Sequence, residues 1–236
     1  IPQPTGKLTI TGTAEVDVSD YATAQVVDAD LVADNIKKDI NILGITGTYE
    51  GSGGGATEPY IEETYNSSKR VVTAKLYGHI YIRDYIYNDC LDLESVQLPN
   101  GTTYIGTQAF RNCSKLHLTS LPDSIKEIGS YAFASTKISL SNLPSDLKKI
   151  DTYAFRYTSE IQNIVFPSGF ETLISNSFQG SGVVTVTFKG PPRTIANSAF
   201  SSCTSLTDIY VPWSEGEVVN APWGATNATI HYNSVV

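Results

Sequence analysis

Charge of either sign is scarce in this sequence, and its basic residues are not clustered. Charged residues make up 17% of the 236 residues and the net charge is −8, whereas about 25% charged residues is usual in soluble domains. The 16 lysines and arginines are scattered, so we expect neither nucleic acid nor an anionic membrane surface as a partner. No run approaches the roughly 20 apolar residues of a membrane span, so direct membrane insertion is not expected either.

Methionine is absent, and so are motifs of catalysis. We expect a chain without methionine to be a mature or trimmed product, so its lack of a signal peptide carries no information. The glycine run at 51–55 lacks the Lys-Ser/Thr pair of a phosphate-binding loop. His79, His117 and His231 stand beside no nucleophile motif. We therefore predict no catalytic residue and no cofactor site.

One six-residue pattern recurs after residue 80: an apolar residue, three variable residues, a small residue and an aromatic residue. Its copies are IRDYIY (82–87), IGTQAF (105–110), IGSYAF (128–133), IDTYAF (150–155), LISNSF (173–178) and IANSAF (195–200). Ile86 is the one exception at the small position. Successive copies start 22 or 23 residues apart, and such a period is typical of a solenoid of stacked repeats.

Each repeat also contains one apolar segment that we predict to be a short strand. These segments are LESVQLP (93–99), LHLTSLP (116–122), ISLSNLP (138–144), IQNIVFP (161–167), VTVTF (184–188) and LTDIYVP (206–212). Proline ends most of them because it cannot donate a ladder hydrogen bond. A turn and a short irregular or helical segment would then carry the small-aromatic pair. Stacking repeats about 4.8 Å apart would bury the aromatic residues in a column.

The three cysteines, Cys90, Cys113 and Cys203, each lie three residues after an aromatic residue of the pattern. An odd number argues against a full disulfide framework. Cys90 and Cys113 lie on adjacent repeats, close enough in principle for a disulfide. We expect buried free thiols instead, because cysteine packs as a small apolar residue.

No metal site is predicted. The sequence contains no Cys-x-x-Cys pair and no Cys-His cluster of the kind that binds zinc. The carboxylates that cluster best are Asp89, Asp92 and Glu94. A calcium site there is less favoured than a solvated turn, because the spacing is not that of a calcium-binding loop.

The combined pattern I-x-x-x-A-F-x-x-C-x-x-L-x-x-I-x-L-P resembles the BspA-like class of leucine-rich repeats over about residues 70–236. The resemblance implies a β-rich, right-handed leucine-rich-repeat solenoid of about six 22–23-residue repeats with caps. Residues 70–80 would cap one end with a strand. Residues 211–233, which contain both tryptophans, resemble the closing segment of such proteins. Because the class is common on bacterial surface proteins, the resemblance also implies a location outside the cell.

The first 50 residues do not follow the repeat, and residues 16–51 resemble a small structural module of phage tail and prophage proteins. We expect a small β-rich module over 1–50, with strands near 7–11, 23–27 and 42–49 and a helix near 34–40. A glycine-rich linker at 51–57 would join it to the solenoid at 58–236.

The candidate binding surface consists of strand residues between the inward-facing apolar positions. Solenoids bind partners on extended concave surfaces, and this row is mostly polar, uncharged and short-chained. Its members are Gln97, His117, Thr119, Ser139, Ser141, Asn163, Thr185, Thr187, Asp208 and Tyr210. A solvated strand face without a ligand is equally consistent with the row. Tyr85, Tyr131 and Tyr153 are expected to face outward on the convex side, where tyrosine suits recognition, or to pack partly buried between turns.

The resemblance, together with the polar strand row, implies a non-catalytic bacterial surface or secreted protein that binds a protein or a glycan. The expected location is extracellular or on the cell surface. The alternative is a phage or prophage tail-associated structural or receptor-binding protein, located in the virion tail and docked through its N-terminal module. An enzyme is a remote alternative, since no motif favours it.

Overall fold

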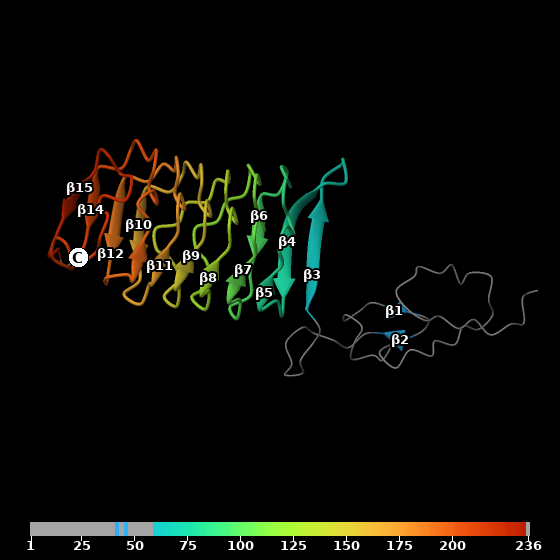
Figure 1. Ribbon diagram of the computed structural model, residues 1–236. Helices are drawn as coiled ribbons and strands as arrows, with labels where there is room; N and C mark the ends of the chain where they lie inside the picture. Colours follow the sequence, from blue (N-terminus) through green and yellow to red (C-terminus); the bar gives the residue numbers. More distant parts are fainter. Residues whose placement is uncertain (1–40, 43–44, 47–58, 235–236) are drawn as a thin grey trace, which may run out of the picture. The chain divides into compact units, whose positions relative to one another are not determined.

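The computed structural model describes residues 41–42, 45–46 and 59–234, and the chain divides into two units, 1–56 and 57–236 (Figure 1). In the first unit, β1 (Asn41–Ile42) pairs antiparallel with β2 (Ile45–Thr46). A single strand near 42–49 does not agree with this pairing, because Ile42 and Ile45 face each other from two antiparallel strands. The strands predicted near 7–11 and 23–27, the helix near 34–40 and the linker at 51–57 lie outside the described residues.

The second unit is a β-solenoid, and one side of it is a six-stranded parallel sheet of two-residue strands (Figure 1). In chain order the strands are β5 (Tyr81–Ile82), β7 (Tyr104–Ile105), β8 (Glu127–Ile128), β9 (Lys149–Ile150), β11 (Thr172–Leu173) and β13 (Thr194–Ile195). Each contains the first apolar residue of one six-residue pattern, at most 2% exposed. The prediction of one strand per repeat is thus incomplete, because this residue forms a second strand.

The longer strands form another side of the solenoid in two separate sheets. The first sheet contains β3 (Tyr60–Tyr65), β4 (Val71–Tyr77) and β6 (Ser95–Gln97), with β3 antiparallel to β4. The second is parallel and contains β10 (Asn163–Phe166), β12 (Thr185–Phe188), β14 (Asp208–Tyr210) and β15 (Thr229–His231). Strands predicted in 93–99, 161–167, 184–188 and 206–212 are confirmed. Those predicted in 116–122 and 138–144 are wrong, apart from a single bridge between Asn142 and Val165.

The interruption between the two sheets has a cause in the sequence. The central residue of each regular strand points into the core; these residues are Val96, Ile164, Val186 and Ile209, at most 6% exposed. Thr119 occupies this position in its repeat, because it follows Phe110 at the same distance as Val96 follows Tyr87. Ser141 occupies it in the next repeat, because the bridge between Asn142 and Val165 places Ser141 opposite Ile164. Burying an unpartnered hydroxyl costs about 1–3 kcal/mol. Thr119 and Ser141 therefore remain exposed, and the strand does not form.

The aromatic residues form the predicted column inside the solenoid. The rings of Tyr87, Phe110, Phe133, Phe155, Phe178 and Phe200 are buried, and consecutive centroids are 4.9 to 5.9 Å apart. Hairpin β3–β4 covers one end of the column. At the other end, Trp213 and Trp223 are buried and pack edge-on against Phe188. Both expected caps are therefore present.

The position three residues after each aromatic residue is buried in five of the repeats, where it holds Cys113, Thr136, Thr158, Ser181 and Cys203. Cys90, in the first repeat, is only partly buried, and all three cysteines are free. The Cys113 thiol donates to the carbonyl of Tyr87 at 3.0 Å, whereas the Thr136 hydroxyl donates to the carbonyl of Phe133 at 2.8 Å. A small side chain with a hydrogen to donate thus satisfies a buried carbonyl at this position.

The segments between the two strands of each repeat are turns rather than helices, and we call the side that they form the turn face. Two positions per turn, four residues apart, recur with positive φ. The first holds Tyr85, Gln108, Tyr131, Tyr153 and Asn176, with φ of 55° to 59°, and the second holds Asp89, Asn112, Ser135, Tyr157, Gly180 and Ser202. Hydrogen bonds between neighbouring turns, such as Phe110 N to Ala132 O at 2.8 Å, maintain this strained backbone.

Candidate binding surface

None of the ten predicted surface residues is buried, and the interruption divides them into groups. The register of β10, β12 and β14 places Asn163 beside Thr185 and Thr185 beside Asp208, and it places Thr187 beside Tyr210. We call these five residues the strand patch. Gln97, His117 and Thr119 lie instead at a pocket, and Ser139 and Ser141 lie in the irregular segment between the pocket and the strand patch.

Three side chains of the strand patch have hydrogen-bond partners, and two of these three, Thr185 and Asn163, are partners of each other. Thr185 Oγ1 donates to Asn163 Oδ1 at 2.6 Å, and His231 Nε2 lies 2.7 Å from Asp208 Oδ1. The His231 ring also stacks on Tyr210, with centroids 4.5 Å apart. Sequence reasoning places His231 in a cap or on the surface. Its position beside Asp208 and Tyr210 depends on the pairing of β14 with β15, which no repeat motif predicts.

Among the described residues, the Asp208–His231 pair lacks the hydroxyl–imidazole hydrogen bond of a Ser-His-Asp triad. The hydrogen bond from His231 lowers the pKa of Asp208. The hydroxyl of Thr207 donates to the same carboxylate, at 2.7 Å, rather than to the imidazole. In a Ser-His-Asp triad the hydroxyl nucleophile is hydrogen-bonded to the imidazole, which acts as its base. The histidine here bridges a carboxylate and a tyrosine ring.

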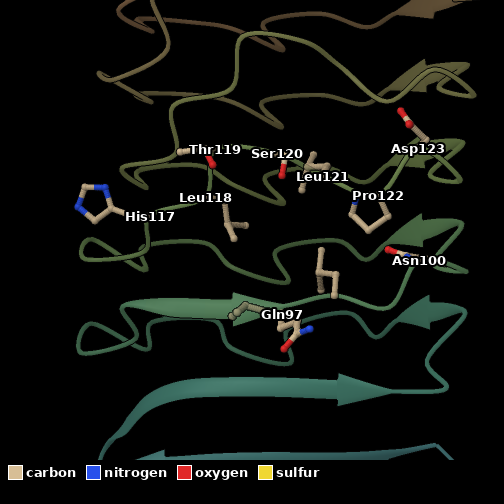
Figure 2. A pocket seen from close by; sticks show the side chains of 11 residues that line it. Gln97, Asn100, His117, Leu118, Thr119, Ser120, Leu121, Pro122 and Asp123 are labelled. Atoms are coloured by element: carbon tan, nitrogen blue, oxygen red, sulfur yellow. The ribbon is translucent and has the colours of Figure 1, made fainter. Parts of the chain in front are cut away.

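The pocket, of about 560 Å³, lies where the strand ladder is interrupted and is lined by residues 96–98, 100 and 117–123. Figure 2 shows Gln97 and Asn100 on one side and the segment from His117 to Asp123 on the other. Val96 and Leu121 are buried beneath it, and Leu98 and Leu118 are partly buried against the core. Amides, hydroxyls, the imidazole and one carboxylate form its rim. The pocket therefore combines an apolar floor with a nearly neutral polar rim and contains no aromatic ring except the imidazole.

Unpaired backbone groups line one side of the pocket. His117 N donates to Glu94 O, at 3.0 Å, and Ser139 N donates to Leu118 O, at 2.8 Å. The amides of residues 118–121 donate to no group of the described chain. Regular turns of the solenoid use such amides in the ladder, so the missing strand leaves a row of backbone donors available to a ligand.

The acidic residues singled out in the sequence do not converge. Asp89 accepts a hydrogen bond from Asn112 at 2.7 Å, whereas Asp92 forms ion pairs with Arg70 at 3.2 Å and Lys115 at 2.7 Å. Within the part of the chain that the structure describes, no group of three or more His, Cys, Asp or Glu residues could hold a metal ion. None of the described segments is a helix long and apolar enough to cross a membrane.

The tyrosines predicted to face outward lie on the turn face. Tyr85 is 55% exposed, as expected for a recognition position. Tyr131 and Tyr153 are only partly exposed and stack on each other, with ring centroids 4.8 Å apart. Outward orientation and packing between turns are thus both present at these two residues.

A comparison with models of protein families identifies the family that has this architecture. The model of the BspA-type leucine-rich repeat region matches six copies over residues 80–208, more than half of the chain. The chain belongs to the BspA-type leucine-rich repeat family. A comparison with curated proteins finds no match to this BspA-type chain.

Solved structures similar to this BspA-type protein are bacterial leucine-rich repeat proteins. The pneumococcal vaccine antigen PcpA is 21% identical, with a TM-score of 0.56 over 72% of this chain and 44% of PcpA. A leucine-rich repeat protein of T. pallidum is 20% identical over 63% of this chain and 78% of its own, with a TM-score of 0.47. A leucine-rich cell surface protein of Faecalibacterium prausnitzii A2-165 is 21% identical over 66% of this chain and 55% of its own, with a TM-score of 0.43.

At these identities the likeness concerns the fold alone, and the BspA-type chain spans less than half the length of PcpA. The solenoid predicted from the repeat is confirmed by the family match and by the structure. The predicted resemblance of residues 16–51 to phage tail proteins receives no support from any of these matches.

Proposed function

We propose that this chain is a non-catalytic binding protein of the bacterial surface or extracellular space that recognises a polypeptide segment at the pocket of residues 96–123. Membership of the BspA-type family supports repeat-based binding outside the cell. The observation that carries the choice of site is the interruption of the strand ladder between β6 and β10, which opens the pocket.

The chemistry of the pocket favours a polypeptide over a sugar. An extended peptide carries carbonyl groups that can accept from the unpaired amides of residues 118–121, as in recognition by strand addition. Its apolar side chains can cover Leu98 and Leu118, which are exposed in part at the floor. The pocket offers no phenyl or indole ring on which a sugar could stack, and its rim carries little charge.

A substitution that restores the strand tests the proposal. Thr119→Val supplies the apolar residue that Val96 and Ile164 provide in the regular strands, so the segment is expected to turn inward and close the pocket. Thr187→Val is the matched control, because Thr187 lies on β12 in the strand patch and its substitution leaves the pocket open. The wild-type chain and both variants would be applied to a library of extended peptides and to a glycan array.

We expect the wild type and Thr187→Val to bind a common set of peptides. Thr119→Val should bind the same peptides at least tenfold more weakly, since it loses more than one hydrogen bond to a backbone amide. If the wild type binds a glycan on the array and Thr119→Val abolishes that binding, the ligand of the pocket is a glycan and not a polypeptide. If Thr119→Val binds the peptides as tightly as the wild type does, the pocket is not the site of recognition.

A further inference from the structure

The turn face carries a continuous stack of five side chains that crosses three consecutive repeats. The guanidinium carbon of Arg111 lies 5.6 Å from the ring centroid of Tyr131, which stacks on Tyr153 at 4.8 Å. The guanidinium carbon of Arg156 contacts the rings of both Tyr153 and Tyr157, at 5.1 and 4.5 Å from their centroids. We call these five residues the arginine–tyrosine stack.

No carboxylate of the described residues neutralises either arginine of the stack. Arg111 Nη1 donates to Gln108 Oε1 at 2.8 Å, and Arg156 Nη2 donates to the Tyr157 hydroxyl at 3.1 Å. Among the described residues, neither guanidinium forms an ion pair, whereas Arg70 and Arg193 are paired with Asp92 and Glu171. Each guanidinium has five N–H donors, so both retain donors for an external anion.

The tyrosine hydroxyls add further donors beside the arginines. The Tyr153 oxygen accepts from Asn176 Nδ2 at 3.2 Å, and the Tyr157 oxygen accepts from Arg156. Each hydroxyl hydrogen is consequently free to donate to another acceptor. Tyr157 is 52% exposed and the other four members are partly exposed, so a ligand can reach this row.

From these contacts we infer that the arginine–tyrosine stack binds a linear acidic polysaccharide through its carboxylates. Arg111 and Arg156 lie two turns apart, which puts their guanidiniums roughly 10 Å apart at about 4.8 Å per turn. A stiff chain with regularly repeated carboxylates matches a row of donors that repeats along the solenoid. The net charge of −8 acts weakly here, because charges beyond about 8 Å are screened at physiological salt.

The backbone of the turn face argues against an acidic peptide as the ligand. The amides of Phe110, Asn112, Phe133 and Phe155 all donate to carbonyls of the next turn. A peptide could therefore gain no backbone hydrogen bonds from these amides, unlike at the pocket of residues 96–123. A polysaccharide needs only the side-chain donors that the stack provides.

Affinity electrophoresis of the full chain through gels containing alginate, a linear polyuronate, tests the assignment, with neutral dextran and poly-L-glutamate gels run in parallel. We expect alginate to retard the wild type, with the retardation weakened by salt, and dextran to have no effect. Arg156→Gln should weaken alginate binding by about tenfold or more, because it removes charged hydrogen bonds. Arg193→Gln removes an equal charge elsewhere and should leave the binding unchanged.

Circular dichroism spectra would establish that each variant is folded. Thr119→Val should retain alginate binding, which separates this site from the pocket proposed above. Absence of alginate retardation of the wild type would overturn the assignment. Equal loss in Arg156→Gln and Arg193→Gln, or equally tight binding to poly-L-glutamate, would overturn it as well.

Discussion

Phe155 lies in the middle of the aromatic column, and its replacement by alanine tests how the solenoid is held together. The ring is fully buried, with centroids 5.7 Å from Phe133 and 4.9 Å from Phe178. Phe→Ala at such a site costs about 3–5 kcal/mol, a large part of the roughly 5–15 kcal/mol that stabilises a typical domain. Because each turn contacts only its neighbours, the defect should also uncouple the two halves of the solenoid.

Two optical probes report different parts of the chain in a urea titration. Tryptophan fluorescence reports the C-terminal turns, since Trp213 and Trp223 are the two tryptophans of the sequence. Far-ultraviolet circular dichroism reports all turns. The transitions from the two probes should coincide in the wild type and separate in Phe155→Ala. Tyr157→Ala, in the same repeat but exposed, is the control and should preserve coincidence. Coincident transitions in Phe155→Ala, with a loss below about 1 kcal/mol, would refute the reasoning.

Three further predictions test individual residues, one by alkylation and two by substitution. Burial raises the pKa of the Cys113 thiol to about 12, so folded protein at pH 8 should not be alkylated at Cys113, and mass spectrometry showing rapid labelling would contradict this. Hydrogen bonds from Lys115 and then from Arg70 lower the pKa of Asp92. Its stabilising effect is therefore complete above the ordinary value of 3.8 and is lost as pH falls through the lowered pKa. Asp92→Asn should accordingly lower the Tm at pH 7 but not in strong acid; an equal deficit at both pH values would exclude the ion pairs as its cause. Gly180 has a φ of +64°, and an added Cβ would lie 2.6 Å from the Tyr157 ring. Gly180→Ala should therefore cost about 1–2 kcal/mol in urea unfolding, and an unchanged midpoint would show that the turn relaxes.

The period of the repeat is enough to predict the solenoid and the aromatic column, because both depend on residue types at fixed spacing. The caps depart from the repeat, and it is the resemblance to BspA-like proteins that predicts them. The second strand of each repeat escapes notice, since two residues are too short to show an alternating pattern. The pocket escapes notice for a different reason. Leu118 and Leu140 are apolar and lie one position before the strand centre, so these two segments resemble strands in the sequence. The central position, whose residue must point into the core for a strand to form, holds Thr119 and Ser141.

The candidate binding surface, too, could be predicted from the sequence only in part. Asn163, Thr185 and Asp208 lie side by side because their repeats form regular strands, and their role in binding stays a prediction. The arginine–tyrosine stack could be anticipated only in part. Tyr131 and Tyr153 share a repeat position, but Arg111, Arg156 and Tyr157 join them through the left-handed turn, which no local sequence signal specifies.

The two left-handed positions of each turn also restrict which residues this protein can display there. Branching at Cβ is strongly disfavoured at positive φ, and the positions indeed hold Tyr, Gln, Asn, Asp, Ser or Gly and no valine, isoleucine or threonine. Side chains at these positions can change without touching the aromatic column, which is built from other residues of the repeat. New binding specificity can therefore arise on the turn face from a limited set of flat or small polar side chains, while the interior that determines stability stays the same.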